Sequence, residues 1–388
     1  MAFDNQYPSV QDLRKKAKER MPAFAFEYRG CNEDVNITRN TAEIREVQLE
    51  PRYLRNYRES STKTSILGME FDAPFGIAPV GLQGLMWRNS PQILSKAAYK
   101  HNIPFILSTV TTMDIEEGSR ITDGRAWFQL YNPVQDEVRN DILKRASDAG
   151  CPVLILLCDV PTFGYRPKDI RNGLALPPKM SAKNILQIPG KPIWAFNTLK
   201  YGHSTFENLK SYTPEGLNLK QLGRFMDKTF SGRLNEDLIK PIRDKWKGKL
   251  ILKGVASERD TKDAIRMGFD GIIVSNHGGR QLDAGESTIK SLQSIAGKHC
   301  DQIEIMMDSG LRSGPDIARA IACGAKFTFM GRSFMYGVGA LGNKGGDHTI
   351  SMMKTQFKQV MEQLCYDRVE YLPKHLVRQN EIISKLEI

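Results

Sequence analysis

The sequence predicts an α/β fold of the (β/α)8 TIM-barrel class, on two observations. First, eight short apolar segments recur along the 388 residues, at 75–80, 105–109, 126–131, 153–159, 249–254, 271–276, 303–309 and 326–331. Most are near-continuous hydrophobic runs, as expected of parallel strands buried on both faces. Second, helical patterns lie between them, for example at 90–100, 138–149, 257–267 and 314–323. Eight strand-then-helix units favour a closed barrel.

An open, doubly wound sheet is the weaker alternative. That fold favours a G-x-G-x-x-G turn after its first strand, because the glycines let the backbone approach a bound pyrophosphate. The segment Ala78-Pro79-Val80-Gly81 does not have this pattern. The barrel therefore remains the prediction.

We predict one domain over residues 1–388 with parts outside the repeat. An N-terminal cap covers 1–70, the barrel covers 71–345 with an insertion after the fourth strand at 160–248, and a C-terminal helix and extended tail cover 346–388. The cap contains a charged helix at 9–20 and an aromatic segment at 24–28. It is expected to close one end of the barrel.

The insertion combines aromatic and basic side chains. Aromatic and aliphatic residues alternate with lysines at Lys191, Ile193, Trp194, Phe196, Leu199, Lys200, Tyr201, Phe206 and Lys210. This composition suits a lid or a patch on a membrane surface, since such amphipathic side chains are favoured at the interface. A loop packed on the barrel rim explains the same residues, and the pattern alone favours that simpler interpretation.

Composition limits the class of protein. The net charge is +11, but no clustered basic module of the nucleic-acid-binding type is present, so nucleic acid is not an expected partner. A solvated basic surface, anionic ligands and an anionic membrane surface all fit this charge. Six cysteines without a CxxC pair argue against a metal site or disulfide framework and for a reducing compartment.

The sequence also shows no feature of export or membrane insertion. Residues 1–6 contain no apolar signal-peptide core, and no run approaches the roughly 20 apolar residues of a membrane span. We therefore expect a cytoplasmic protein, with peripheral attachment to the inner membrane left open.

The segment from Ser275 to Asp283, SNHGGRQLD, carries the clearest chemical signal. It follows a predicted strand, at the end of a barrel where active sites lie. His277 is suited to act as a general base, and Arg280 three residues later is suited to bind a carboxylate. The glycines between them let the backbone approach a ligand.

Other predicted strand ends supply polar residues that would converge on the same ligand. These are Tyr131, Asp159 with Arg166 after it, Lys253, Asp308 with Arg312, and Gly331-Arg332. Lys253 ends an apolar run, so its charge needs an anion or a polar ligand. A helix cap is the less favoured alternative for Asp159, and Tyr28 alone is more typical of a core residue.

Arg312 and Arg332 lie after the seventh and eighth strands, where barrels commonly hold a phosphate. Guanidinium groups match phosphate oxygens in pairs. From the residues we therefore predict a phosphorylated cofactor over these strands, with a lysine near its ring and a His–Asp base beside it.

These motifs resemble the FMN-dependent 2-hydroxy acid oxidases and dehydrogenases over nearly the whole chain, and the SNHGGRQLD segment matches the family signature. Gly81-Leu82, Leu107-Ser108-Thr109 and the segments 127–131 and 164–166 look closest to L-lactate and (S)-mandelate dehydrogenases. The resemblance implies an FMN cofactor and oxidation of an (S)-2-hydroxy acid to a 2-keto acid.

The resemblance also implies roles for individual residues. His277 is the base and Asp159 stabilises its charged form. Arg280, Arg166, Tyr28 and Tyr131 bind the substrate, and Lys253 lies beside the flavin. The implied cofactor-binding residues are Pro79, Val80, Gly81, Ser108, Gln129, Tyr131, Lys253, Ser275, Asp308, Ser309, Gly310, Leu311, Arg312, Gly331 and Arg332.

Departures from the family pattern refine the expectation. Leu157 replaces a usual Thr near the flavin, and the turn at 29–32 is one residue short. Small residues at Gly81 and Val110 suggest a substrate larger than glycolate, and Gly81 favours a dehydrogenase over an oxidase. The resemblance implies a homotetramer and transfer of electrons to a quinone, a cytochrome or oxygen.

Alternatives within the resemblance are an oxygen-using oxidase and a lactate monooxygenase. Isopentenyl-diphosphate isomerases share the barrel and FMN but lack the His–Arg turn. A non-catalytic flavin-binding scaffold would have no reason to keep His277.

Overall fold

The computed structural model describes residues 5–28, 35–57, 59–162, 166–173, 181–202, 204–213, 229–230 and 233–377. Eight parallel strands form one sheet: β3 (Phe75–Ile77), β4 (Ile106–Ser108), β5 (Trp127–Leu130), β6 (Val153–Leu157), β7 (Lys249–Val255), β8 (Gly271–Val274), β9 (Glu304–Met307) and β10 (Phe327–Met330). Their order is β3-β10-β9-β8-β7-β6-β5-β4. A parallel bridge between Ile77 and Phe105 joins the two ends, so the sheet closes into the predicted barrel.

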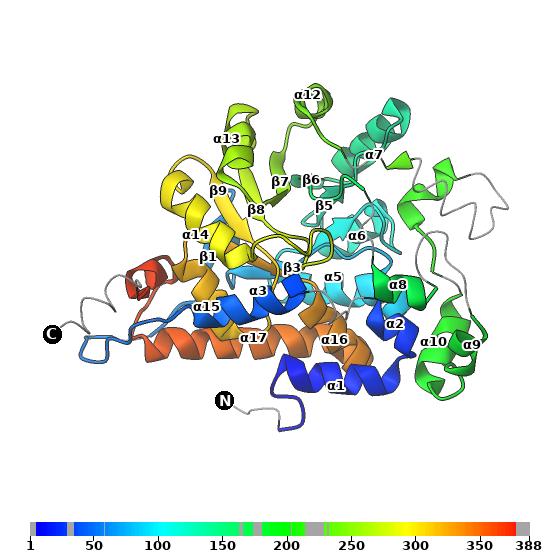
Figure 1. The fold of residues 1–388 in the computed structure, drawn as a ribbon, viewed down its shortest axis with the longest axis horizontal. Helices are drawn as coiled ribbons and strands as arrows, with labels where there is room; N and C mark the ends of the chain where they lie inside the picture. Colours follow the sequence, from blue (N-terminus) through cyan, green and yellow to red (C-terminus); the bar gives the residue numbers. More distant parts are fainter. Residues whose placement is uncertain are drawn as a thin grey trace.

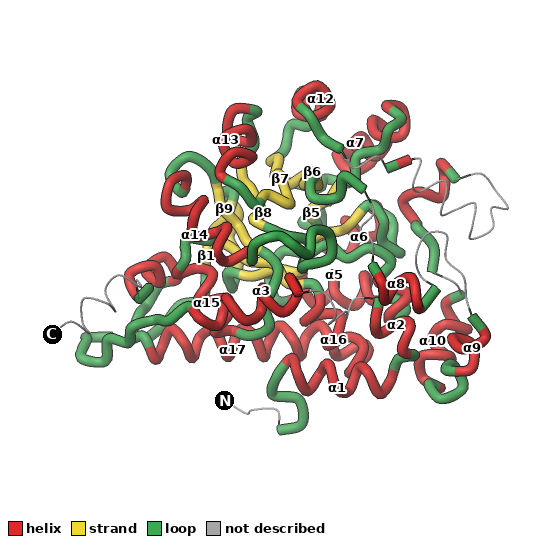
Figure 2. The backbone as a smooth tube through the Cα atoms, viewed as in Figure 1, coloured by secondary structure: helices red, strands yellow, loops and turns green. Residues whose placement is uncertain are grey.

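A helix follows every barrel strand and covers its outer face (Figure 1; Figure 2). In order they are α5 (Ser90–Lys100), which is preceded by the short α4 (Gln83–Met86), then α6 (Ile115–Thr122), α7 (Asp136–Asp148), α12 (Glu236–Lys245), α13 (Glu258–Arg266), α14 (Thr288–His299), α15 (Gly314–Ala322) and α16 (Arg332–Leu341). Side chains fix several starting points: Asp114, Asn235, Ser257 and Ser313 each accept a hydrogen bond from a backbone N–H of the first turn.

Apolar side chains fill the barrel on both faces of the strands. One buried cluster includes Trp127, Ile251 and Phe327 inside the barrel, and a second lies between strands and helices. A hairpin of β1 (Thr64–Ile66) and β2 (Met69–Phe71) closes the interior at the amino ends of the strands, where the Phe71 ring lies 6.3 Å from Trp127 and 5.7 Å from Phe327. The opposite, carboxyl end of the barrel is left for ligands.

The helices α1 (Val10–Arg20), α2 (Ala23–Glu27) and α3 (Val35–Glu46) lie before this hairpin. The long helix α17 (Gly345–Gln363), which follows the 3-10 turn η2 (Gly342–Lys344), runs beneath α15 in Figure 1. The prediction of an extended C-terminal tail is wrong for η3 (Val369–His375), a 3-10 helix. It forms because Val369 and Leu372 are buried against the core.

The insertion after β6 contains α8 (Pro167–Arg171), α9 (Ala182–Leu186), α10 (Pro192–Tyr201) and η1 (Glu207–Tyr212). The prediction of a loop is therefore wrong for these stretches. Contact with the barrel rim does occur: Trp194 is buried, its Nε1 donates to the Met86 carbonyl, and its ring meets Phe24 edge-on. The opposite face of α9 and α10 is exposed at the periphery of the molecule (Figure 1).

Candidate active site

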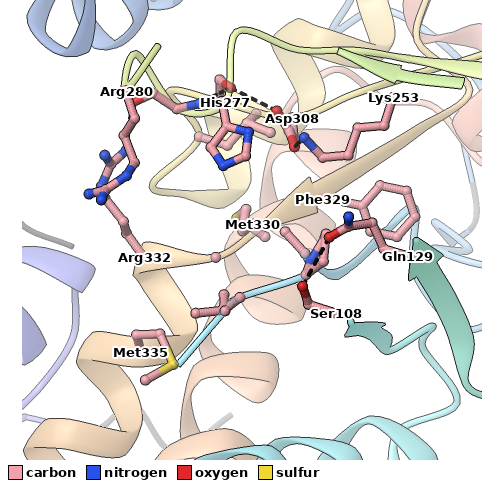
Figure 3. Close-up of a pocket in the computed structure, with 18 of the residues that line it drawn as sticks. Ser108, Gln129, Lys253, His277, Arg280, Asp308, Phe329, Met330, Arg332 and Met335 are labelled. Carbon is pink, nitrogen blue, oxygen red and sulfur yellow. Dashed lines mark hydrogen bonds and ion pairs between the residues drawn. The ribbon is translucent and has the colours of Figure 1, made fainter. Parts of the chain in front are cut away.

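The carboxyl ends of the barrel strands surround a cavity with about 780 Å³ of open space. His277, Lys253, Gln129 and Arg332 reach it from four different strand ends or turns (Figure 3). This is the end of a barrel that positions ligands, because every parallel strand delivers a side chain there.

His277 stands in the turn after β8 with φ +57°, a left-handed conformation unusual for a residue with a Cβ. Its backbone N–H donates to Ser275 Oγ at 3.1 Å, and its Nδ1 lies 3.0 Å from Asp159 Oδ1. The carboxylate thus fixes the ring and leaves Nε2 for the cavity. Asp159 itself needs glycine at Gly254, where a Cβ would lie 2.5 Å from the Asp159 Cβ.

Electrostatics keep this histidine neutral and the aspartate charged. Burial lowers the pKa of His277. The Asp159 carboxylate raises this pKa, the charges of Lys253 and Arg166 lower it, and the net pKa lies below the ordinary histidine value. Burial raises the pKa of Asp159, but the charge of Lys253 and the hydrogen bond from His277 outweigh it, so this pKa is lowered. A neutral imidazole beside a carboxylate is the arrangement of a general base.

Lys253 provides a buried positive charge on the cavity wall. Its Nζ lies 3.0 Å from Asp308 Oδ2 and donates to Ser275 Oγ at 2.9 Å. Burial lowers the pKa of Lys253, but Asp308 and Asp159 more than offset this and raise it. The prediction that Lys253 ends its strand is wrong: β7 continues to Val255, with an irregularity in register between the two.

Two arginines lie together beside the His–Asp pair. Arg280 Nη1 donates to the Tyr28 carbonyl at 2.8 Å, and its Nη2 lies 3.2 Å from Asp169 Oδ2. Arg166 Nη2 donates to Gln281 Oε1 at 2.6 Å, and its Nη1 is 3.8 Å from the same Asp169 oxygen. Burial and the neighbouring charge of Arg280 lower the pKa of Arg166 to about 10. One buried carboxylate thus holds two guanidinium groups.

The far end of the cavity is suited to a phosphate. After β9 the chain turns through Ser309 (φ +75°) and Gly310 (φ +85°), and a Cβ on Gly310 would lie 2.6 Å from the Asn40 carbonyl. Arg312 follows this turn, and Arg332 begins α16, whose first turn has no side-chain cap. Uncapped backbone N–H groups and guanidinium groups are anion ligands.

The cavity fits FMN, the cofactor implied by the resemblance. Gln129 Oε1 accepts from Ser108 Oγ at 3.1 Å (Figure 3). Gln129 Nε2 is buried and has no hydrogen-bond partner among the described residues, so it needs an acceptor from a ligand. Apolar groups of Ala78, Leu157 and Met330 line the same space. A polar edge, an apolar surface and an anion site match a flavin with its phosphate.

Most predicted site residues line this cavity: Pro79, Val80, Gly81, Ser108, Gln129, Tyr131, Lys253, His277, Arg280, Asp308, Ser309, Gly310, Leu311, Arg312, Gly331 and Arg332. Four do not line it: Asp159 lies behind His277, Ser275 bonds to Lys253, and Tyr28 and Arg166 lie around Arg280. The turn at 29–34 and residues 163–165 lie outside the described residues.

Sequence reasoning missed several residues. Ala78, Gly278, Phe329, Met330 and Met335 line the cavity, and Asp169 and Gln281 hold the arginines. Gly278 and Gln281 belong to the SNHGGRQLD segment, so that signal was available. Asp169 stands three residues after Arg166, a spacing that brings side chains together on a helix.

Comparison with known proteins agrees with this geometry. The family model of FMN-dependent dehydrogenases matches residues 17–379. An L-lactate dehydrogenase of Caulobacter sp. (strain K31) is 35% identical over 356 residues, 91% of this chain and 93% of that protein. One of Vibrio parahaemolyticus is 35% identical over 353 residues, covering 90% and 93%.

Solved structures extend the comparison. The crystal structure of the monotopic membrane protein (S)-mandelate dehydrogenase superposes with a TM-score of 0.91 at 31% identity, covering 97% of this chain and all of that one. A mandelate oxidase gives a TM-score of 0.79 at 26% identity, covering 96% and 98%. This chain belongs to the FMN-dependent dehydrogenase family, and its cofactor is FMN.

Proposed function

We propose that this enzyme oxidises an (S)-2-hydroxy acid to a 2-keto acid, with His277 as the base. FMN-dependent oxidation of a 2-hydroxy acid is the reaction class of the relatives it resembles over nearly its whole length. The observation that carries the assignment of residues is the His277–Asp159 pair beside Arg280 at one cavity.

The chain's own residues would hold the cofactor along the cavity. Gln129 and Ser108 would meet the polar edge of the ring system, the 309–312 turn and Arg332 would meet the phosphate, and Lys253 would lie near the ring. When bound, FMN supplies a two-electron acceptor for oxidation of the substrate. Lys253 keeps its charge beside Asp308, and a fixed positive charge favours the gain of electrons nearby.

Arg280 and Arg166 would bind the substrate carboxylate, with Tyr28 and Tyr131 as further hydrogen-bond donors. Arg280 lines the cavity, and Asp169 fixes its guanidinium from behind. A planar guanidinium held in this way binds a carboxylate with defined orientation. The bound acid would then present its hydroxyl-bearing carbon to the base.

His277 would take one proton from the CH–OH group of the substrate at Nε2, and the second hydrogen and the two electrons removed from that group would be accepted by FMN. Its neutral state at neutral pH makes it ready to do so. Asp159 then stabilises the imidazolium through Nδ1. Release of that proton to solvent, departure of the keto acid and transfer of the two electrons to a further acceptor would restore the site.

The substrate we propose is L-lactate or a bulkier acid such as (S)-mandelate. Gly81 and the half-buried Val110 are small, which leaves room for a larger tail than that of glycolate. Named relatives act on lactate or mandelate. Electrons would then pass to a quinone or another acceptor; an oxygen-using oxidase is the alternative that the likeness to a mandelate oxidase supports.

An anaerobic titration tests this function. Purified protein is mixed with L-lactate, (S)-mandelate or glycolate while the flavin absorbance is followed. We expect bleaching by lactate or mandelate and slow recovery in air. Fast recovery in air would favour the oxidase, and no bleaching by any of the three acids would contradict the proposed substrate class.

We also propose peripheral attachment to an anionic membrane through α9 and α10. The exposed face carries Ile185, Leu186, Ile193, Phe196 and Leu199, the last with 84% of its surface accessible. Lys183, Lys191 and Lys200 lie on the same two helices or at their start. Exposed apolar groups beside lysines suit the headgroup region. No helix among the described residues is long and apolar enough to cross a bilayer.

Sedimentation with phosphatidylglycerol vesicles at low salt tests the attachment. We expect the protein to sediment with the vesicles and Phe196→Ser to reduce the bound fraction. Protein that stays entirely in the supernatant would contradict this proposal.

We also propose a homotetramer, as the family resemblance implies. Light scattering on the purified protein tests it, and a mass of about four chains is expected.

A further inference from the structure

A second cleft lies on the other side of the phosphate end of the active site. Arg14 of α1, Arg45 of α3, Arg312 and Arg332 line it, so four cationic side chains come from four separate elements. The cleft has about 1630 Å³ of open space, which includes the solvent at its mouth. Arg312 and Arg332 are shared with the cofactor cavity, whereas Arg14 and Arg45 line the cleft alone.

The other lining residues do not neutralise this charge. Among the described residues that line the cleft, none is an aspartate or a glutamate. Ser9 and Thr41 donate their hydroxyl protons to Asp12 and to the Ile37 carbonyl, and Thr38, Ser313 and Tyr336 contribute further hydroxyl groups. Among the described residues, no carboxylate lies within ion-pair distance of the Arg14 or Arg45 guanidinium. The Arg14 guanidinium lies over the Phe26 ring, 5.7 Å from its centroid. Hydroxyl groups and unneutralised guanidinium groups are the usual ligands of phosphate.

The charges of Arg14 and Arg45 act on the pKa of Arg312. Burial lowers the pKa of its guanidinium, Tyr336 and Asp316 act in the opposite direction, and the charges of Arg14 and Arg45 lower it further. The cofactor phosphate carries roughly −1.5 to −2 charges at neutral pH. That phosphate belongs to the cavity that Arg312 and Arg332 line, and Arg14 and Arg45 lie outside that cavity.

We propose that this cleft binds a second phosphate-bearing anion, a soluble compound of the phosphate or diphosphate class, next to the phosphate of FMN. Its phosphate would contact Arg14 and Arg45, and the hydroxyl groups on the wall would complete its hydrogen bonds.

Calorimetric titration of the FMN-loaded protein with pyrophosphate, in a phosphate-free buffer of fixed ionic strength, tests the proposal. We expect saturable binding of one pyrophosphate per chain, weakened at least about tenfold in Arg14→Gln and in Arg45→Gln. Lys15→Gln removes the same charge from an exposed position of α1 outside the cleft and should bind as the unmodified protein does. Lack of binding, or equal weakening by all three variants, would overturn the proposal.

Two further measurements separate this site from its neighbours. The FMN content of the two arginine variants should remain that of the unmodified protein in the absence of pyrophosphate. Loss of FMN would instead assign both arginines to the cofactor phosphate. Vesicles containing phosphatidic acid form a second arm: if the variants weaken vesicle binding but not pyrophosphate binding, the ligand is a lipid headgroup and the proposal of a soluble anion fails.

Discussion

The active-site cavity and the exposed face of α9 and α10 differ in which groups they shield from water. The cavity shields charged side chains, whereas the exposed face leaves apolar side chains in contact with solvent. In the cavity, Lys253 is buried and held by Asp308, and His277 is held by Asp159. On α9 and α10, apolar side chains such as Leu186 and Leu199 are exposed. Buried charge is kept where chemistry needs it, and exposed apolar surface where an apolar partner covers it. Substitutions in the two regions should therefore have very different effects.

His277→Gln should give the largest effect. Glutamine cannot take a proton, so we expect flavin reduction to slow by about 10²- to 10⁴-fold while FMN stays bound. Anaerobic stopped-flow measurement of flavin bleaching gives the rate. His101→Gln is the matched control, because His101 also pairs with an aspartate, Asp347, away from the cavity. Near-normal bleaching in His277→Gln would rule out its role as the base.

Lys253→Met should give the largest loss of stability. Methionine leaves Asp308 buried without its partner, which costs about 3–5 kcal/mol of unfolding free energy. Urea denaturation measures the loss, and Lys240→Met, whose pair with Asp244 is exposed, serves as the control. Equal stability of the two variants would show that the buried pair is not needed.

Asp169→Asn should change substrate binding more than chemistry. The uncharged amide weakens the contact that fixes the Arg280 guanidinium, so we expect KM to rise about tenfold, or about 1.4 kcal/mol, with a smaller change in kcat. Steady-state kinetics with the hydroxy acid separate the two constants. An equal fall in kcat with unchanged KM would assign Asp169 to the chemical step instead.

The dependence of kcat/KM on pH should report the opposing effects of burial and of Asp159 on the pKa of His277. Its lowered pKa predicts that kcat/KM falls on the acid side, as the imidazole becomes protonated, with an inflection below the ordinary histidine value. Asp159 raises this pKa, so Asp159→Asn should move the inflection to still lower pH. Measurement of kcat/KM from pH 4.5 to 8 gives both inflections, and a shift to higher pH would contradict the assignment.

Leu199→Ser should give the smallest effect on the folded protein. The side chain is 84% exposed, so its removal changes the unfolding free energy by no more than about 0.5 kcal/mol. Thermal denaturation checks this. A clear loss of stability would show that the exposed face packs against another part of the protein, for instance a second copy, and not against lipid.

The strands and the central site were accessible from the sequence for physical reasons. Each barrel strand is buried on both faces, so it reads as an apolar run, and its predicted end exposes a polar residue. The SNHGGRQLD segment could be recognised from its own residues, without knowing which distant side chains contact it. The insertion was harder to predict. Helices such as α10 have one face against the core and one in solvent, and the residue pattern does not show which aromatic and aliphatic side chains are buried.

The sequence by itself determined the barrel, the His277–Arg280 turn and the polar strand ends that line the cavity, because these depend on local runs of residues in a repeated order. Only the tertiary structure decided which charges meet. Asp159 and His277 are 118 positions apart, and Asp169 reaches Arg280 across 111. Pairing of Lys253 with Asp308, and convergence of Arg14, Arg45, Arg312 and Arg332, depend on how distant segments pack, which residue spacing does not encode.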